Sequence, residues 1–149
     1  MLPEQFCVRM KEMLGEEYAA FYASYDLPKY QALRINPLKT ERDTFLLQAP
    51  FSLNRVPWTT NGYYYSGNDQ PGRHPYHEAG VYYIQEPSAM APAEYLMAEP
   101  GERILDLCAA PGGKSTQIAC SMQGEGLIVC NGLHSSQASS FLRNIPSPE

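Results

Sequence analysis

Apolar residues recur along residues 3–25 at the three- and four-residue spacing of a helix. In chain order they are Phe6, Met10, Met13, Leu14, Tyr18, Phe21, Tyr22 and Tyr25. Glycine favours breaks in a helix, so Gly15 is expected to divide this stretch into two short helices. Thr40, followed by acidic residues, resembles a capped helix start, and residues 41–48 are therefore predicted to form another short helix.

Short β-like runs fill the centre of the chain, between clusters of asparagine, glycine and proline. The predicted strands are residues 32–37, 51–56, 62–65 and 81–84. Residues 67–72 are predicted to form an exposed loop. Residues 87–96 are predicted to form a helix with Pro87 in its first turn, where proline is tolerated, and Pro92 is expected to kink that helix.

The last third of the chain alternates strand and helix patterns. An apolar run at 103–108 leads through a glycine-rich turn into a helical pattern at 114–122. A second apolar run follows at 127–131, with a weaker helical pattern at 135–145. This order predicts two parallel strands joined by a crossover helix.

Composition and charge narrow the possible function classes. No stretch approaches the ~20 apolar residues that a membrane span requires, and the first residues do not resemble an export signal, so a cytoplasmic protein without a membrane segment is predicted. The four cysteines form no Cys-x-x-Cys pair and no ligand pattern with the three histidines, so no metal site is predicted. The net charge is −5, yet residues 27–77 carry six basic and three acidic groups and are the only electropositive stretch.

Two adjacent glycines, Gly112 and Gly113, lie where the apolar run gives way to the helical pattern. Such a turn presents free backbone N–H groups to a polar or anionic ligand at the carboxyl end of a sheet, and Asp106 lies just before it. A phosphate-binding P-loop would share the Gly-Lys-Ser at its end but requires a glycine in place of Cys108. A dinucleotide fingerprint requires three spaced glycines, and a turn that binds no ligand also remains possible.

The complete string at 106–116, Asp-Leu-Cys-Ala-Ala-Pro-Gly-Gly-Lys-Ser-Thr, closely resembles the cofactor motif of one enzyme family. This is the Sun and nucleolar-protein family of RNA (cytosine-5) methyltransferases. Residues 82–90, Tyr-Tyr-Ile-Gln-Glu-Pro-Ser-Ala-Met, resemble that family's preceding motif, and residues 33–39 and 56–58 resemble its N-terminal lobe. In order and spacing the resemblance extends to about Asn131.

The resemblance implies a fold, a cofactor and a partner. The implied fold class is α/β: a small mixed α+β lobe at 1–77, then, at 78–149, the first β-α-β unit of a Rossmann-like S-adenosylmethionine-dependent methyltransferase fold, incomplete at the C-terminus. The implied activity is methylation of RNA, with ribosomal RNA as the expected partner. The predicted cofactor-binding residues, which act mostly through main-chain groups, are Cys108, Ala109, Ala110, Pro111, Gly112, Gly113 and Lys114.

The electropositive segment is interleaved with aromatic residues, which suits contact with RNA phosphates and bases. The residues considered for this contact are Arg34, Lys39, Arg42, Arg55, Arg73, Trp58, Tyr63, Tyr64 and Tyr65. The alternative is a solvated basic face with the aromatic residues in the core. The resemblance favours contact, because the family's N-terminal lobe lies beside its RNA-binding face.

Two features depart from the family. Gly132 occupies the position, just after the second strand, at which the family carries an acidic residue suited to the cofactor's ribose hydroxyls. The family's catalytic cysteines lie in Pro-Cys and Thr-Cys pairs, and this chain contains neither pair. No catalytic residue is therefore predicted, and the chain is expected to be an inactive, truncated N-terminal part of such an enzyme. The alternatives are a non-catalytic RNA-binding fragment and a P-loop nucleotide-binding protein.

Overall fold

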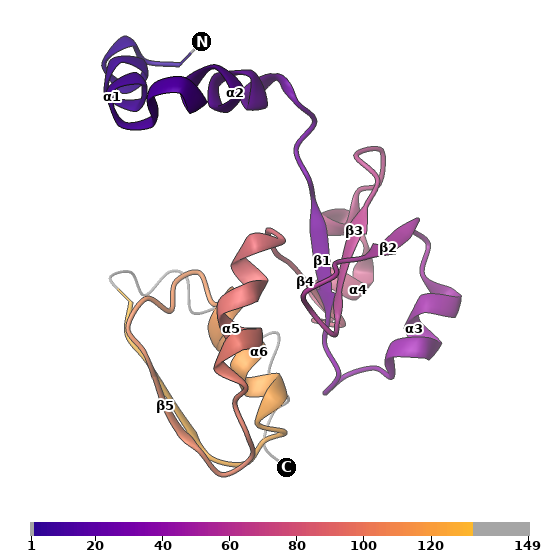
Figure 1. Cartoon of the computed structure of the whole chain (residues 1–149). Coiled ribbons are helices and arrows are strands. Elements are labelled where there is room, and N and C mark those ends of the chain that lie inside the picture. Colours follow the sequence, from indigo (N-terminus) through magenta and orange to yellow (C-terminus); the bar gives the residue numbers. More distant parts are fainter. Residues whose placement is uncertain (1, 133–149) are drawn as a thin grey trace.

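The computed structural model describes residues 2–132, which form two β-sheets with helices packed on them (Figure 1). In chain order the elements, with 3-10 helices labelled η, are α1 (Glu4–Leu14), η1 (Gly15–Glu17), α2 (Tyr18–Ala23), η2 (Ser24–Asp26), β1 (Ala32–Ile35), α3 (Arg42–Gln48), β2 (Leu53–Arg55), β3 (Gly62–Tyr65), η3 (Pro71–Arg73), α4 (Pro75–Glu78), β4 (Tyr82–Ile84), η4 (Ser88–Met90), α5 (Ala91–Leu96), β5 (Arg103–Asp106), α6 (Gly113–Ser121) and β6 (Leu127–Cys130). None of the helices within these residues has the length and apolar character that crossing a membrane requires.

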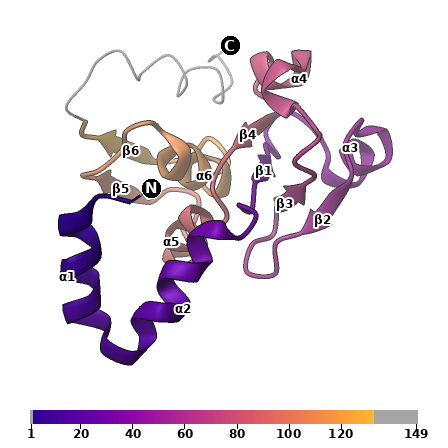
Figure 2. The same cartoon turned by 90° about the horizontal axis from the view of Figure 1, so that it is seen from above.

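Helices α1 and α2 form a hairpin that stands away from both sheets (Figures 1 and 2). The chain turns at Gly15, whose φ of 53° lies in the left-handed region that glycine adopts without strain. This confirms the predicted division of the first helical stretch. Aromatic rings join the two arms of the hairpin: the ring centroid of Phe6 in α1 lies 6.2 Å from that of Phe21 in α2 and 6.5 Å from that of Tyr25 in η2.

The first sheet has the strand order β2-β3-β1-β4, and every neighbouring pair is antiparallel. All four residues of β1 are buried, so this central strand is covered on both faces. Because side chains alternate along a strand, Leu33 and Ile35 share one face and pack with Phe45 of α3. Ala32 and Arg34 point to the opposite face, where Ala32 packs with Met90. η4 and α6 pack against that opposite face.

Two details of the predicted helices are wrong. The N-cap of α3 is Glu41 and not Thr40, because the Glu41 carboxylate accepts a 2.7 Å hydrogen bond from the Thr44 amide. This hydrogen bond lowers the pKa of Glu41. Pro92 does not kink a continuous helix, since it lies in the first turn of α5, and a separate 3-10 turn, η4, precedes it. Proline fits this position because the first turn leaves N–H groups without helical acceptors.

The second sheet consists of β5 and β6, which are parallel and in register from Arg103 with Leu127 to Asp106 with Cys130. Helix α6 connects them, which confirms the predicted β-α-β unit. Helices α5 and α6 cover one face of this sheet, and the residues that pack there are Ala93, Ala98, Ile118, Met122, Ile104 and Ile128. The helix predicted at 135–145 lies outside the described residues.

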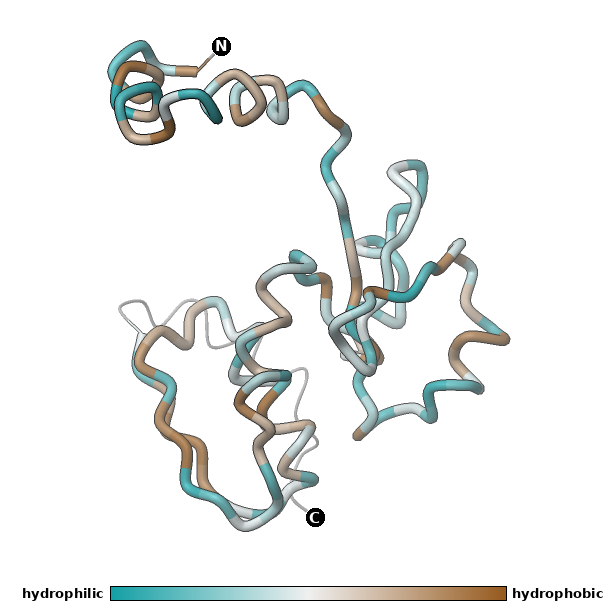
Figure 3. Tube along the Cα trace, in the orientation of Figure 1, coloured by the Kyte–Doolittle hydropathy of each residue, from teal (hydrophilic) through white to brown (hydrophobic). Residues whose placement is uncertain are grey.

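The opposite face of the second sheet is apolar and exposed, and Figure 3 shows β5 and β6 as a hydrophobic run. Its side chains are 48–65% exposed, and they are Leu105, Leu107, Leu127 and Val129. Contiguous exposed apolar surface of this kind favours self-association. We therefore expect the double substitution Leu127→Thr, Val129→Thr to reduce self-association in light-scattering chromatography without lowering the melting temperature. Ile128→Thr, on the helix-covered face, is expected to lower that temperature, and equal self-association of the double variant and the parent would contradict the prediction.

Candidate functional site

Two hydrogen bonds to the Asp106 carboxylate stabilise the turn between β5 and α6. One carboxylate oxygen, Oδ1, accepts a hydrogen bond from the Cys108 amide at 3.0 Å. The other, Oδ2, accepts one from the hydroxyl of Ser115, which is fully buried, at 2.5 Å. Asp106 thus ties the end of the strand to both the start of the turn and the first turn of the helix.

Both glycines of the turn occupy positions that other residues fit poorly. Gly112 is the N-cap of α6 and has a φ of 111°, which is strained for any residue with a side chain. Gly113 lies against side chains of the first sheet, since a Cβ atom there would approach Tyr83 Cε1 and Gln85 Cδ at 3.3 Å each. The first glycine therefore shapes the turn, and the second allows the N-terminal lobe to approach it.

The start of α6 presents main-chain donors. The first hydrogen bond of the helix along the chain is donated by the Thr116 amide to the Gly112 carbonyl, at 2.9 Å. The amides of Gly113, Lys114 and Ser115 precede it, as expected for the first turn of a helix. Together with the helix dipole, these amides suit a ligand with a polar or anionic group.

The structure places the predicted residues Cys108 to Lys114 in one contiguous turn. Not all of their main-chain groups are available to a ligand. The Ala109 amide donates to the Asn131 carbonyl at 3.1 Å, so this group joins the turn to β6. Gly132 lies beside the turn as well, because a Cβ atom there would lie 3.6 Å from the Ala110 Cβ. The position at which the family carries an acid is therefore adjacent to the candidate site.

A cleft of about 320 Å³ runs beside the turn. It is lined by Asp106, Cys108 and Lys114 and by apolar residues of α5, β5, the start of the turn and α6, namely Pro92, Ala93, Leu96, Ile104, Leu105, Leu107 and Ile118. Of the predicted cofactor-binding residues, Cys108 and Lys114 line this cleft, whereas Ala109 to Gly113 do not. The side chain of Cys108 is exposed.

Arg34 contacts the turn from the N-terminal lobe. Its side chain is only 4% exposed, and its guanidinium donates to the Gly113 carbonyl at 2.7 Å and to Thr116 Oγ1 at 2.8 Å. It also donates to Gln85 Oε1 and lies 5.5 Å from the centre of the Tyr83 ring. Burial lowers the pKa of Arg34 to about 10. The prediction that Arg34 contacts RNA phosphates is therefore wrong, because the side chain is buried between the first sheet and α6.

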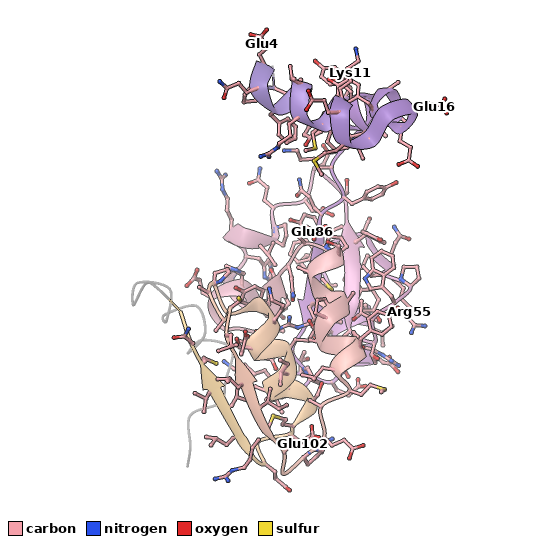
Figure 4. All side chains as sticks on the ribbon, turned by 60° about the vertical axis from the view of Figure 1, so that its left-hand side comes forward. Glu4, Lys11, Glu16, Arg55, Glu86 and Glu102 are labelled. Atoms are coloured by element: carbon pink, nitrogen blue, oxygen red, sulfur yellow. The ribbon has the colours of Figure 1, made fainter. Side chains whose placement is uncertain are left out.

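Other members of the electropositive segment are also engaged within the protein. Tyr63 is buried, the Lys39 ammonium donates to the Ala79 carbonyl at 2.8 Å, and the Trp58 indole donates to the Pro87 carbonyl at 3.0 Å. Arg42 forms an exposed ion pair with Asp43 at 2.8 Å. Arg55 and Arg73 are exposed, and Figure 4 shows Arg55 on the side of the molecule away from β5 and β6. Within residues 2–132, no group of three or more potential metal ligands is assembled.

Comparison with known proteins identifies the family. Residues 2–87 match the N-terminal domain of 16S rRNA methyltransferase RsmF, and residues 93–147 match 16S rRNA methyltransferase RsmB/F. The chain belongs to the RsmF family. It is 36% identical to ribosomal RNA small subunit methyltransferase F of Enterobacter sp., over 96% of this chain and 32% of the relative. The chain thus spans about a third of the length of this curated relative.

Solved structures support the same fold. A methyltransferase homologue from Pyrococcus horikoshii is 27% identical with a TM-score of 0.81, over 96% of this chain and 50% of that one. NSun6 from Pyrococcus horikoshii with SFG has a TM-score of 0.79 at 16% identity, over 95% of this chain and 62% of that one. The expected fold, an N-terminal lobe followed by the beginning of a Rossmann-like methyltransferase domain, is confirmed. Methyltransferases of this family use S-adenosylmethionine, so the P-loop interpretation is set aside.

Sequence reasoning missed the residues that reach the turn from the first sheet, namely Arg34, Tyr83 and Gln85. Tyr83 donates a hydrogen bond from its hydroxyl to the Pro111 carbonyl at 3.3 Å. These residues occur in the strings 33–39 and 82–90, whose resemblance to the family was visible. The resemblance identifies residues 33–39 and 82–90 as family motifs, but it does not indicate that they contact the glycine turn.

Proposed function

We propose that this chain is the N-terminal part of an S-adenosylmethionine-dependent ribosomal RNA (cytosine-5) methyltransferase and that the turn at 108–114 surrounds the cofactor. Bound there, the cofactor supplies an electrophilic methyl group. The observation that carries the proposal is the β5–α6 turn, in which two glycines and the amides of Gly113, Lys114 and Ser115 begin a helix at the carboxyl end of a parallel strand.

The residues of the turn fit a cofactor with a polar group and an apolar part. The amides at the start of α6 and the Lys114 side chain suit a carboxylate. The apolar walls of the neighbouring cleft suit an aliphatic or aromatic portion. Gly132 is the one position that fits less well, because it offers no side-chain acceptor next to Ala110.

We further propose that the chain alone does not transfer a methyl group. Cytosine methylation in the family requires a cysteine in a Pro-Cys pair and another in a Thr-Cys pair. The residues that precede the four cysteines here are Phe6, Leu107, Ala119 and Val129. Cys120 does not substitute for them, since it is buried in α6 and burial raises its pKa, which disfavours the thiolate that acts as a nucleophile.

The boundary between the two parts of the chain is also a proposal; the sequence predicts it between residues 77 and 78, and we propose to move it toward the C-terminus. Strand β4 follows residue 77 in sequence but pairs with β1 of the first sheet. The match to the N-terminal domain ends at residue 87, and the match to the methyltransferase domain begins at residue 93. Both observations favour a boundary within 88–92.

The test combines two measurements on the purified chain. Titration with S-adenosylmethionine in a calorimeter is expected to show saturable binding at one site, and incubation with labelled cofactor and 16S ribosomal RNA is expected to leave the RNA unlabelled. Absence of binding would refute the cofactor site, and labelled RNA would refute the inactivity. RNA binding that weakens steeply with salt, without cofactor binding, would instead support the RNA-binding fragment.

A further inference from the structure

Arg34 is a buried cation whose guanidinium donates to neutral acceptors. The nitrogen Nη1 donates to the carbonyl oxygen of Gly113 at 2.7 Å, and Nη2 donates to Thr116 Oγ1 at 2.8 Å. The hydroxyl of Thr116 in turn donates to the Gly112 carbonyl at 2.8 Å. One side chain of the first sheet therefore reaches, directly or through Thr116, the carbonyls of both glycines in the turn.

The orientation of these two carbonyls determines the orientation of two amides. Each peptide group is planar, so the Gly112 carbonyl shares its plane with the Gly113 N–H, and the Gly113 carbonyl shares its plane with the Lys114 N–H. When the carbonyls are directed toward Arg34 and Thr116, the two N–H groups are directed the opposite way. Arg34 thus acts on the donors that a ligand at the start of α6 would meet.

Neighbouring residues keep Arg34 in this position. Gln85 accepts a hydrogen bond from the guanidinium and donates to the Ala89 carbonyl at 3.0 Å, and Tyr83 places its ring 5.5 Å away. The absence of a side chain on Gly113 gives β4 the room to lie against the turn. Residues of the first sheet and the glycine of the turn therefore both favour the contact between Arg34 and the Gly113 carbonyl.

We propose that Arg34 is a positioning residue that orients the amides of the glycine turn for cofactor binding. This inference rests on the proposed function, because it assigns a role within the same site. It makes cofactor affinity depend on a residue of the N-terminal lobe that does not itself line the cleft beside the turn.

Arg34→Lys tests the proposal, because lysine keeps the charge but replaces the two-pronged guanidinium by a single ammonium. We expect the affinity for S-adenosylmethionine, measured by calorimetry, to fall roughly tenfold or more, as for the loss of a charged hydrogen bond. Hydrogen–deuterium exchange of the amides at 113–117, measured without ligand, is expected to accelerate. Arg55→Lys, the same change at an exposed arginine of the same sheet, is expected to alter neither quantity.

A second control separates positioning from a general loss of stability. Thr59 donates from its hydroxyl to Glu94 Oε1 at 2.8 Å, a contact between the N-terminal lobe and α5 that lies outside the turn and, among the described residues, is connected to Arg34 only through Gln117. Thr59→Val is expected to lower the melting temperature while leaving cofactor affinity and exchange at 113–117 unchanged. If Arg34→Lys fails to fold, Thr116→Val replaces it, since that substitution removes the acceptor of Nη2 from the other side.

The possible results are distinguishable. Unchanged affinity and exchange in Arg34→Lys, or an equal loss of affinity in Thr59→Val, would overturn the positioning role. If the parent chain binds no cofactor, the proposed function fails, and the exchange measurement alone decides whether Arg34 orders the turn. Weaker binding together with faster exchange, confined to the Arg34 and Thr116 variants, is the result that supports the inference.

Discussion

Replacing Gly126 by alanine is expected to reduce the free energy of unfolding by about 3 kcal/mol or more, enough to unfold a chain of marginal stability. Gly126 has a φ of 111° and lies in the turn that leads from α6 into β6. A Cβ atom there would lie 2.4 Å from the Glu102 carbonyl oxygen and 3.1 Å from the Glu102 nitrogen. Backbone atoms cannot rotate aside, and the same carbonyl accepts the Leu127 amide at 2.9 Å in the first link of the parallel pair.

Gly124→Ala is the matched control. Gly124 lies in the same turn with a φ of 84°, but no atom lies within 4 Å of a Cβ added to it. Its substitution is therefore expected to introduce only backbone strain, of about 1–2 kcal/mol. Chemical denaturation monitored by circular dichroism compares the two variants. Equal destabilisation would mean that the contact with Glu102 contributes nothing beyond the strain of a positive φ.

The β-α-β unit was predictable because its signals are local. The apolar runs at 103–108 and 127–131 and the helical spacing between them specify two strands and a helix, and a strand-helix-strand order leaves a parallel pair as the natural arrangement. The predicted strands extend beyond the observed ones, by two residues for β5, which ends at Asp106, and by one residue for β6, which ends at Cys130. The residues after β5 leave the sheet because the Asp106 carboxylate accepts the Cys108 amide and so bends the chain into the turn.

The role of Arg34 was not predictable from local pattern. A charged residue in a strand usually faces solvent, and the electropositive segment 27–77 places Arg34 among the candidates for RNA contact. It is buried because β1 is the inner strand of its sheet and carries a second layer on the face opposite to Phe45. That layer comes from η4, through Met90, and from α6, through Thr116, both more than 50 residues later in the chain, and no periodicity links them to β1.

Several hydrogen bonds join the N-terminal lobe to the glycine turn and to α6. Tyr83 donates to the Pro111 carbonyl, Arg34 donates to the Gly113 carbonyl, and Gln117 of α6 donates to the Met90 carbonyl at 3.1 Å. Removing one partner of the Arg34 or Gln117 hydrogen bond would leave the other polar group without a partner in a buried or partly buried position, which is costly. The N-terminal lobe and the glycine turn are thus joined through hydrogen bonds at the turn itself.

Introducing an acid at position 132 is expected to increase the affinity for S-adenosylmethionine by about ten- to a hundredfold, the range expected for a charged hydrogen bond. The resemblance to the family implies that this position normally carries a carboxylate for the ribose hydroxyls of the cofactor. The first atom of a side chain fits there among the described residues, because a Cβ atom on Gly132 would be in ordinary van der Waals contact with Ala110, at 3.6 Å. Gly132→Glu therefore adds a carboxylate acceptor to a position beside the turn that accepts a Cβ atom.

Two substitutions separate this effect from a change in net charge. Gly67→Glu adds the same charge in the exposed loop between β3 and η3, where no atom lies within 4 Å of an added Cβ, and it is expected to leave the dissociation constant unchanged. Gly132→Gln provides a neutral acceptor of similar length and is expected to recover only part of the gain, because hydrogen bonds to a charged group are about twice as strong. Calorimetric titration of the three variants gives the comparison. Equal affinities for Gly132→Glu and Gly67→Glu would show that the ribose of the cofactor does not lie beside position 132, and the proposed orientation of S-adenosylmethionine on the glycine turn would have to be abandoned.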